Sequence, residues 1–266
     1  MSVSNRASEI APQFRERVWG RRDLRPFFDR TFDNPVGEAW FDCGCPILVK
    51  LLFTSDRLSV QVHPDDEYAQ KHHHSLGKTE AWYIIDSQPP GELAVGFREP
   101  LTPEKLKAAA QSGEIEQLLD WRKVKEGDVI FTPAGTVHAI GAGLTICEIQ
   151  ENSDITYRLY DYGRPRELHL ERGAEVSHLG PHEFNPTPRA LADGREELVA
   201  CEYFRIERLK PKALITIPSG SPYYLILIST KGKAWFVPAN NDEFTVRGGE
   251  WILTYKSETP AEIKLA

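Results

Sequence analysis

From about residue 46, the chain consists of short runs of β-branched, aromatic and aliphatic residues separated by turn residues. Runs of this length are typical of the strands of an antiparallel sandwich or barrel. Before residue 165, the predicted strands are ILVKLLF (47–53), LSVQVH (58–63), EAWYIID (80–86), ELAVGF (92–97), DVIFTP (128–133), LTICEIQ (144–150) and ITYRLYD (155–161). The pattern therefore predicts a mainly β protein.

One stretch departs from the strand pattern, because its apolar residues recur at helical spacing. Residues 102–119 begin with Thr102, a suitable N-cap, followed by Pro103, which fits the first position of a helix. We expect one or two short helices here, inserted between strands near 102–120.

The second half of the chain predicts a separate β unit. Residues 163–196 are rich in Gly, Pro, Arg and Glu and predict an irregular connecting segment. Further predicted strands follow in LVACEYFRIERL, PYYLILIST, KAWFVP and EWILTY. We therefore expect two domains, residues 1–165 and residues 166–266, the second including the connecting segment.

Two patterns of the first half recur in the second half. KEGDVIFT (125–132) is matched by RGGEWILT (247–254), and EAWYIIDS (80–87) by PYYLILIS (222–229), where Pro222 stands in place of Glu80. This similarity favours two related β-barrels, of which only the first carries His and Glu residues that could serve in catalysis. Chance similarity between β-hairpins is the alternative explanation.

Charge and hydropathy exclude several classes of protein. The net charge of −7 is spread over the chain without a basic stripe, so the electrostatic footprint of a nucleic-acid-binding protein is missing. No apolar run reaches the roughly eighteen residues that a membrane span needs. The amino-terminal sequence also lacks the apolar core of a secretory signal. We expect a cytoplasmic protein that binds neither nucleic acid nor a membrane.

The cysteines do not predict a disulfide framework or a zinc knuckle. Only four occur in 266 residues, at Cys43, Cys45, Cys147 and Cys201. The single residue between Cys43 and Cys45 is a poor match to zinc-knuckle spacing, and no second pair completes a set of four ligands. We expect ordinary reduced thiols.

Four residues on predicted strands could hold a metal ion. Gln61 and His63 lie two positions apart on one strand, so both side chains point to the same face. Glu80 begins the next strong strand, and His138 follows the turn at Gly135. Two imidazoles and a carboxylate can converge in a barrel and leave a position open, as a catalytic metal requires. Zinc suits this set best; manganese, iron or cobalt could substitute.

A histidine triplet is the competing metal motif. His72, His73 and His74 are consecutive, but they lie in a polar stretch between two predicted strands. We expect a solvated loop there rather than a metal site.

Four motifs carry a resemblance to a known family. QVHPDD, GKTEAWY, PAGTVHAI and ENSDITYRLYDYGR, in this order and spacing, resemble the type I mannose-6-phosphate isomerases, or phosphomannose isomerases, of the cupin superfamily in their short bacterial form. The resemblance covers residues 17–170 well and the remainder by layout. It implies two cupin-like jelly-roll β-barrels with a short helical insertion in the first. It also implies a zinc-dependent interconversion of mannose 6-phosphate and fructose 6-phosphate.

The resemblance also assigns roles to individual residues. The implied metal ligands are Gln61, His63, Glu80 and His138, and the implied catalytic residues are Lys78, Glu148 and Arg158. Isomerisation passes through an enediolate, so cations such as Lys78 and Arg158 would stabilise the developing negative charge, and an arginine also suits a phosphate. Glu148 would carry the proton between the two carbons. Glu151 is three residues further along the same strand and is expected to point away.

The chain departs from its longer relatives between two implied ligands. Those relatives insert a large helical domain between the positions of Glu80 and His138, where this chain has room only for the short helices near 103–119. The pocket is therefore expected to be more open on that side, and part of the phosphate-binding set has no counterpart.

Two other functions fit the same residues. A different cupin enzyme, such as an iron-dependent dioxygenase or a sugar epimerase, would use similar ligands, although Lys78 and Arg158 favour an anionic sugar. A non-catalytic module that binds a sugar phosphate around a structural metal is the second alternative, and the weak glutamine ligand argues against it. The sequence allows a monomer or a homodimer and implies no organic cofactor.

Overall fold

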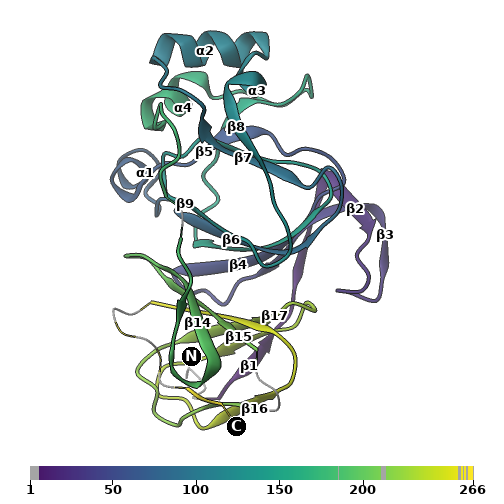
Figure 1. Cartoon of the computed structure of the whole chain (residues 1–266), viewed down its shortest axis with the longest axis vertical. Coiled ribbons are helices and arrows are strands. Elements are labelled where there is room, and N and C mark those ends of the chain that lie inside the picture. The colour runs from purple at the N-terminus through teal and green to yellow at the C-terminus, as the bar shows by residue number, and fades with distance from the viewer. Residues whose placement is uncertain are drawn as a thin grey trace.

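The computed structural model of the chain describes residues 6–184, 186–210, 214–256, 259, 261 and 263–265. They form two β units, one above the other in Figure 1, and helices lie at the far end of the upper unit. This arrangement confirms the prediction of a mainly β, cupin-like protein with short helices in the first unit.

The first unit consists of two facing sheets. The six-stranded sheet has the order β2 (Gln13–Asp23), β3 (Thr31–Phe41), β4 (Ile47–Phe53), β11 (Leu144–Glu151), β6 (Glu80–Ser87) and β9 (Val129–Thr132). The five-stranded sheet has the order β12 (Tyr157–Tyr160), β5 (Val60–Val62), β10 (His138–Ile140), β7 (Glu92–Phe97) and β8 (Leu119–Lys123). In the described part of the chain, neighbouring strands of these two sheets run antiparallel.

The second unit also has two sheets. The larger has the order β1 (Ser8–Ile10), β18 (Ala234–Val237), β17 (Leu225–Ser229), β20 (Trp251–Tyr255), β15 (Arg205–Leu209), β14 (Arg195–Ala200) and β13 (Arg189–Ala190). The smaller has the order β19 (Phe244–Arg247), β16 (Leu214–Ile217) and β21 (Lys264–Leu265). The segments that echo each other form neighbouring antiparallel strands in both units, β6 with β9 and β17 with β20.

The helices are short and lie on the outside of the first unit. They are α1 (Asp66–His73), α2 (Pro103–Ser112), α3 (Ile115–Leu118) and α4 (Leu170–Val176), and a 3₁₀ turn, η1 (Ala192–Gly194), precedes β14. As predicted, Thr102 caps α2, since its side chain accepts a hydrogen bond from the Lys105 amide at 3.2 Å. No helix in the described ranges is long and apolar enough to cross a membrane.

Two local predictions were wrong. His72 and His73 form the last turn of α1, and His74 ends it in a left-handed conformation, where a loop was expected. The helix forms because Asp65 caps its first turn and basic residues lie at its carboxyl end. The segment 163–196, expected to be irregular, contains α4.

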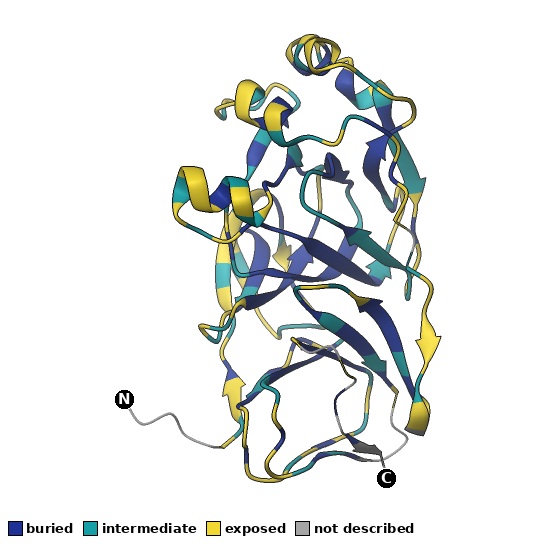
Figure 2. Ribbon diagram, turned by 90° about the vertical axis from the view of Figure 1, so that its left-hand side faces the viewer, coloured by how far each residue is buried: buried dark blue, intermediate teal, exposed yellow. Residues whose placement is uncertain are grey.

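The central strands of the first unit are buried on both faces. Alternate residues of β4 face opposite sides: Val49, Leu51 and Phe53 belong to a large core cluster, whereas Lys50 and Leu52 line a cavity. The same cluster contains Ile226 and Ile252 and their neighbours from the second unit. Figure 2 shows this buried layer between the two units. One face of the sheet therefore packs against the second unit, and the other face forms the site.

Candidate active site

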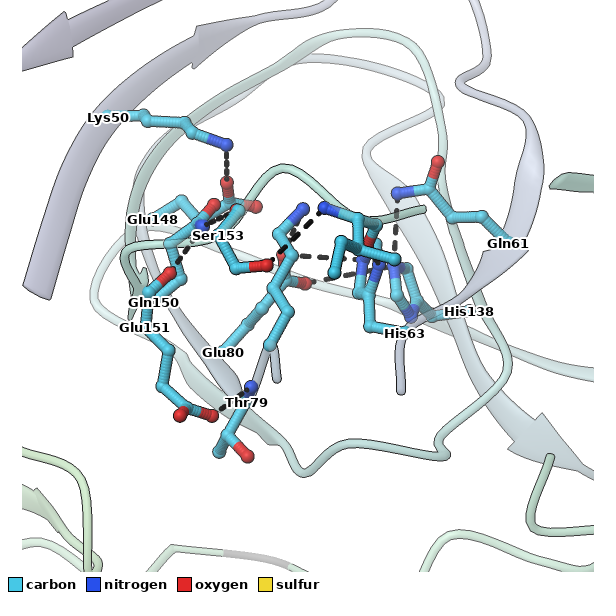
Figure 3. Close-up of polar contacts among 12 residues, drawn as sticks. Lys50, Gln61, His63, Thr79, Glu80, His138, Glu148, Gln150, Glu151 and Ser153 are labelled. Atoms are coloured by element: carbon cyan, nitrogen blue, oxygen red, sulfur yellow. Dashed lines mark hydrogen bonds and ion pairs between the residues drawn. The ribbon is translucent and has the colours of Figure 1, made fainter. Parts of the chain in front are cut away.

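The four predicted metal ligands come from facing sheets of the first unit. Gln61 of β5 lies directly opposite His138 of β10, and His63 follows β5. Glu80 begins β6 in the other sheet. Ligand atoms of His63, Glu80 and His138 all lie within 4.8 Å of one another, and the three side chains are buried (Figure 3). The fold thus brings together residues that are far apart in the sequence.

The two histidine Nε2 atoms lie farther from the Glu80 carboxylate than in a typical hydrogen bond, and this spacing suits an ion between them. His63 Nε2 lies 3.4 Å from Glu80 Oε1, and His138 Nε2 lies 3.7 Å from Glu80 Oε2. Among the described residues, His63 Nε2 and Glu80 Oε2 are buried without a hydrogen-bond partner. Buried polar atoms normally have a partner, so these unpaired atoms point to a bound ligand.

The other ring nitrogens of the two histidines fix their orientation. His63 Nδ1 lies 2.8 Å from the Ile155 carbonyl oxygen, and His138 Nδ1 lies 2.9 Å from the Thr136 carbonyl oxygen. Since a carbonyl can only accept, each Nδ1 carries the hydrogen and each Nε2 keeps a lone pair directed into the site. Burial also lowers the pKa of both imidazoles, which favours the neutral form that binds metals. These features fit a divalent metal ion.

Gln61 lies at the same site in a different orientation from that of a ligand. Its amide nitrogen lies 3.2 Å from His138 Nε2, and its amide oxygen accepts a hydrogen bond from the Ser59 hydroxyl. The oxygen is the atom that would bind a metal. A half-turn of the terminal amide exchanges the two atoms, so coordination needs no movement of the backbone.

Two buried lysines adjoin the metal cluster. Lys78 Nζ lies 3.0 Å from Glu80 Oε1. Burial alone would lower the pKa of Lys78, but the charges of Glu80 and Glu148 raise it above its usual value. Lys78 therefore stays charged. The second lysine, Lys50, is 2% exposed and lies 3.2 Å from Glu148 Oε1.

The sequence analysis did not identify Lys50 as a candidate site residue. It is the charged residue in the otherwise apolar strand ILVKLLF, and this lone charge was the available signal. The sheet explains this charge, because it places Lys50 opposite Glu148 on the neighbouring strand. Tryptophans lie on either side of the pair, with Trp40 opposite Lys50 and Trp82 opposite Glu148. Glu148 also accepts a hydrogen bond from the Trp82 indole at 3.0 Å.

Glu148 and Glu151 point in opposite directions, as their spacing predicted. Glu148 lines the cavity, whereas Glu151 accepts a hydrogen bond from the Thr79 amide on the other side of the strand (Figure 3). Burial raises the pKa of Glu151 to about 7. Glu151 therefore holds the backbone just before Glu80 and does not reach the cavity.

Arg158 lines the cavity from β12. Its Nη1 donates a hydrogen bond to the Glu167 carbonyl oxygen at 2.8 Å, while its Nε is buried without a hydrogen-bond partner among the described residues. Among the described residues, the nearby carboxylate of Asp161 forms ion pairs with Arg164 and Arg166 rather than with Arg158. Burial and the neighbouring arginines lower the pKa of Arg158. The guanidinium group of Arg158 thus lines the cavity, and one of its nitrogens has no hydrogen-bond partner among the described residues.

One cavity of about 350 Å³ adjoins the metal cluster through Gln61, which contacts His138, and Lys78, which contacts Glu80. Its walls include Gln61, Lys50, Lys78, Glu148 and Arg158. A cavity of this volume suits a small molecule, and its predominantly charged lining favours a polar, anionic one. The arrangement can hold such a ligand next to a metal ion, a carboxylate and two ammonium groups.

Several known proteins are similar to this chain over most of its length. No family model matches the chain. A mannose-6-phosphate isomerase of Bacillus subtilis is 41% identical over 263 residues, covering 82% of this chain and 83% of the relative. The mannose-6-phosphate isomerase of Streptococcus mutans is 35% identical over 218 residues, covering 78% of this chain and 67% of the relative.

Several solved structures are similar as well. The crystal structure of a mannose 6-phosphate isomerase from Bacillus subtilis superposes with a TM-score of 0.77 at 27% identity, covering 95% of this chain and all of that one. A phosphomannose isomerase from Salmonella typhimurium, at 15% identity and a TM-score of 0.69 over 94% of this chain and 99% of that one, shares the fold. The chain therefore belongs to the type I mannose-6-phosphate isomerase family.

Proposed function

We propose that the chain is a metal-dependent aldose–ketose isomerase that interconverts mannose 6-phosphate and fructose 6-phosphate. The observation that carries the proposal is the buried cluster of His63, Glu80 and His138, which adjoins a cavity lined by cations. The similarity to named isomerases supports it. We further propose a cytoplasmic monomer or homodimer, with the metal site in residues 1–165.

The proposed metal ligands are His63, Glu80 and His138, with the Gln61 amide oxygen as the fourth. Two imidazoles and a carboxylate favour zinc, and manganese, iron or cobalt are alternatives. When bound, such an ion supplies a Lewis acid that polarises the sugar carbonyl. The protein holds the ligands in place through the two Nδ1 hydrogen bonds to backbone carbonyls.

The two lysines would stabilise the charge that develops during the reaction. Proton removal next to a carbonyl places negative charge on the oxygens of C1 and C2 of the sugar. Lys50 and Lys78 present ammonium groups at the cavity and are almost fully buried, so water screens them little. Their positions are fixed by Glu148 and Glu80, so little reorganisation is needed in the transition state.

Glu148 is the proposed proton carrier. Its carboxylate lies in the cavity wall and is held by Lys50 on one oxygen and by the Trp82 indole on the other. Each carboxylate oxygen has a second lone pair, so Glu148 can still accept a proton from one carbon of the sugar and return it to the neighbouring carbon.

Arg158 is the proposed contact for the phosphate. Its buried Nε lacks a partner, and Arg166 lines the same cavity while bound to Asp161. Two guanidinium groups beside one wall can bind a phosphate dianion with several hydrogen bonds. In this chain, they would replace the part of the phosphate site that longer relatives take from their helical insertion.

A coupled assay with mannose 6-phosphate tests the proposal. We expect isomerisation by the metal-replete chain, loss after chelation and recovery with zinc. His63→Ala should lose metal and activity. His72→Ala, at the exposed end of α1, is the matched control and should keep both. Absence of isomerisation in the metal-replete chain would refute the proposed function.

A further inference from the structure

Arg158, the proposed contact for the phosphate, lies on a strand that is paired on one side. This strand, β12, is at the edge of the five-stranded sheet. It pairs with β5, where Gln61 lies opposite Arg158, and no described strand pairs with its other side. Backbone groups of Arg158 that point to this open side need partners from elsewhere in the chain. The residue that supplies them helps to fix the position of Arg158.

His169 supplies both partners. Its backbone amide donates a hydrogen bond to the Arg158 carbonyl oxygen at 2.7 Å, and the Arg158 amide donates one to His169 Nδ1 at 3.1 Å. A single residue thus takes the place of a neighbouring strand. A third hydrogen bond runs from Arg158 Nη1 to the Glu167 carbonyl oxygen at 2.8 Å. The three bonds hold the backbone and the guanidinium of Arg158 against one short loop.

The contact with Nδ1 determines the state of the His169 ring. A backbone amide can only donate, so Nδ1 carries a lone pair and the hydrogen of the neutral ring lies on Nε2. His169 is partly buried, and burial lowers the pKa of its imidazole, which favours this neutral form. A leucine at this position offers no acceptor, whereas the Oδ1 atom of an asparagine can lie close to the place of Nδ1.

The His169 side chain serves this contact and not its own helix. His169 is the N-cap of α4, where side chains commonly accept a hydrogen bond from the first turn, but it makes no such bond. The helix lies so close to β12 that a Cβ on Gly173 would be 2.5 Å from Leu159 Cδ2. The Gly173 amide donates to the His169 carbonyl oxygen at 2.8 Å. The helix α4 therefore fixes His169 beside Arg158.

We propose that His169 is a positioning residue, which holds Arg158 in the orientation that binds the phosphate of the substrate. The identity of this ligand rests on the proposed function, whereas the contact between the two residues rests on the geometry alone. A misplacement of about 1 Å can lower a reaction rate about 10²-fold. Without the acceptor at Nδ1, β12 is held less firmly at Arg158, and the contact of the guanidinium with the phosphate weakens.

Hydrogen exchange of the Arg158 amide tests the contact without any substrate. NMR spectra of the zinc-replete chain give the exchange rate of this amide and show which nitrogen of the His169 ring carries the hydrogen. In the wild type, we expect a protected amide and a hydrogen on Nε2. His169→Leu should speed the exchange at least about tenfold, because it removes the acceptor. His169→Asn should retain most of the protection.

Kinetics of the same variants test the link to the substrate. In His169→Leu, the KM for mannose 6-phosphate should rise about tenfold, as expected for one weakened hydrogen bond to a charged group. Since Arg158 itself remains, kcat should change less, and the bound metal should be retained. His169→Asn should restore the KM. His73→Leu is the matched control, because His73 Nε2 lies 2.6 Å from the hydroxyl of Tyr157, also on β12, and this variant should keep the wild-type KM.

Three results would overturn the proposal. One is a hydrogen on Nδ1 of the wild-type His169 ring, which needs no variant to be observed. Another is an Arg158 amide that exchanges equally fast in the wild type and in His169→Leu. The third is a wild-type KM in His169→Leu although this amide exchanges faster. If the wild-type chain does not isomerise mannose 6-phosphate, the proposed function fails, while the NMR measurements still decide whether His169 holds Arg158.

Discussion

Substitution of Lys50 tests whether its buried ion pair with Glu148 stabilises the fold. The two charged atoms of the pair lie 3.2 Å apart, and the side chains are 2% and 6% exposed. Lys50→Met keeps the length of the side chain and removes the charge, so Glu148 is left as a buried carboxylate without its cation. We expect a large loss of stability as well as a loss of activity.

The size of the loss follows from the burial of the pair. Removing one partner of a buried ion pair typically lowers the free energy of unfolding by about 3–5 kcal/mol. Replacing both partners with apolar residues is often neutral or stabilising, because no buried charge remains. The double variant Lys50→Met, Glu148→Leu should therefore be at least as stable as the wild type, although it should be inactive.

Urea unfolding of the metal-free chain, followed by circular dichroism, measures these differences. We expect a clearly lower midpoint for Lys50→Met and recovery in the double variant. A single variant that loses less than about 1 kcal/mol, or a double variant as unstable as the single one, would refute the reasoning. The first result would mean that water in the cavity, rather than Lys50, compensates the charge of Glu148. The second would mean that the loss of stability comes from packing rather than from the unpaired charge.

Four further predictions concern single residues. His138→Ala should lose both bound metal, measured by elemental analysis, and activity. Arg158→Met should keep its metal but lose turnover; metal loss in this variant would contradict the proposed role. Glu148→Gln should lower kcat by about 10²–10⁴ with its metal retained. Glu151 holds its proton up to about pH 7 in the folded chain, against 4.5 as its usual value, so the free energy of unfolding should fall as pH rises between these values; Glu151→Gln should flatten this slope in urea unfolding.

Local patterns predicted most of the strands and the cap of α2, because each depends on short-range features of the sequence. Gln61 and His63 both reach His138 because side chains alternate along a strand, and the cap at Thr102 acts within one turn. Lys50 could not be assigned in this way. Its partner Glu148 is brought opposite by the pairing of β4 with β11, and no feature near residue 50 specifies that pairing.

The helix α1 was missed for a related reason. Its sequence DEYAQKHH has a weak apolar face, with Ala69 as its buried residue. A helix of this length depends on its cap and on contacts with the rest of the fold rather than on its own periodicity. In the same way, the orientation of Glu151 followed from strand alternation, but its raised pKa depends on burial, which only the folded chain shows.

The sheet that carries Lys50 and Glu148 has its reverse face in a core shared with the second unit, including Val49, Ile149 and Ile226. The second unit therefore covers the apolar face of the sheet whose other face carries Lys50 and Glu148. Separating the halves near residue 165 would expose this apolar layer to water, so the first half alone is expected to aggregate rather than to fold into a smaller enzyme.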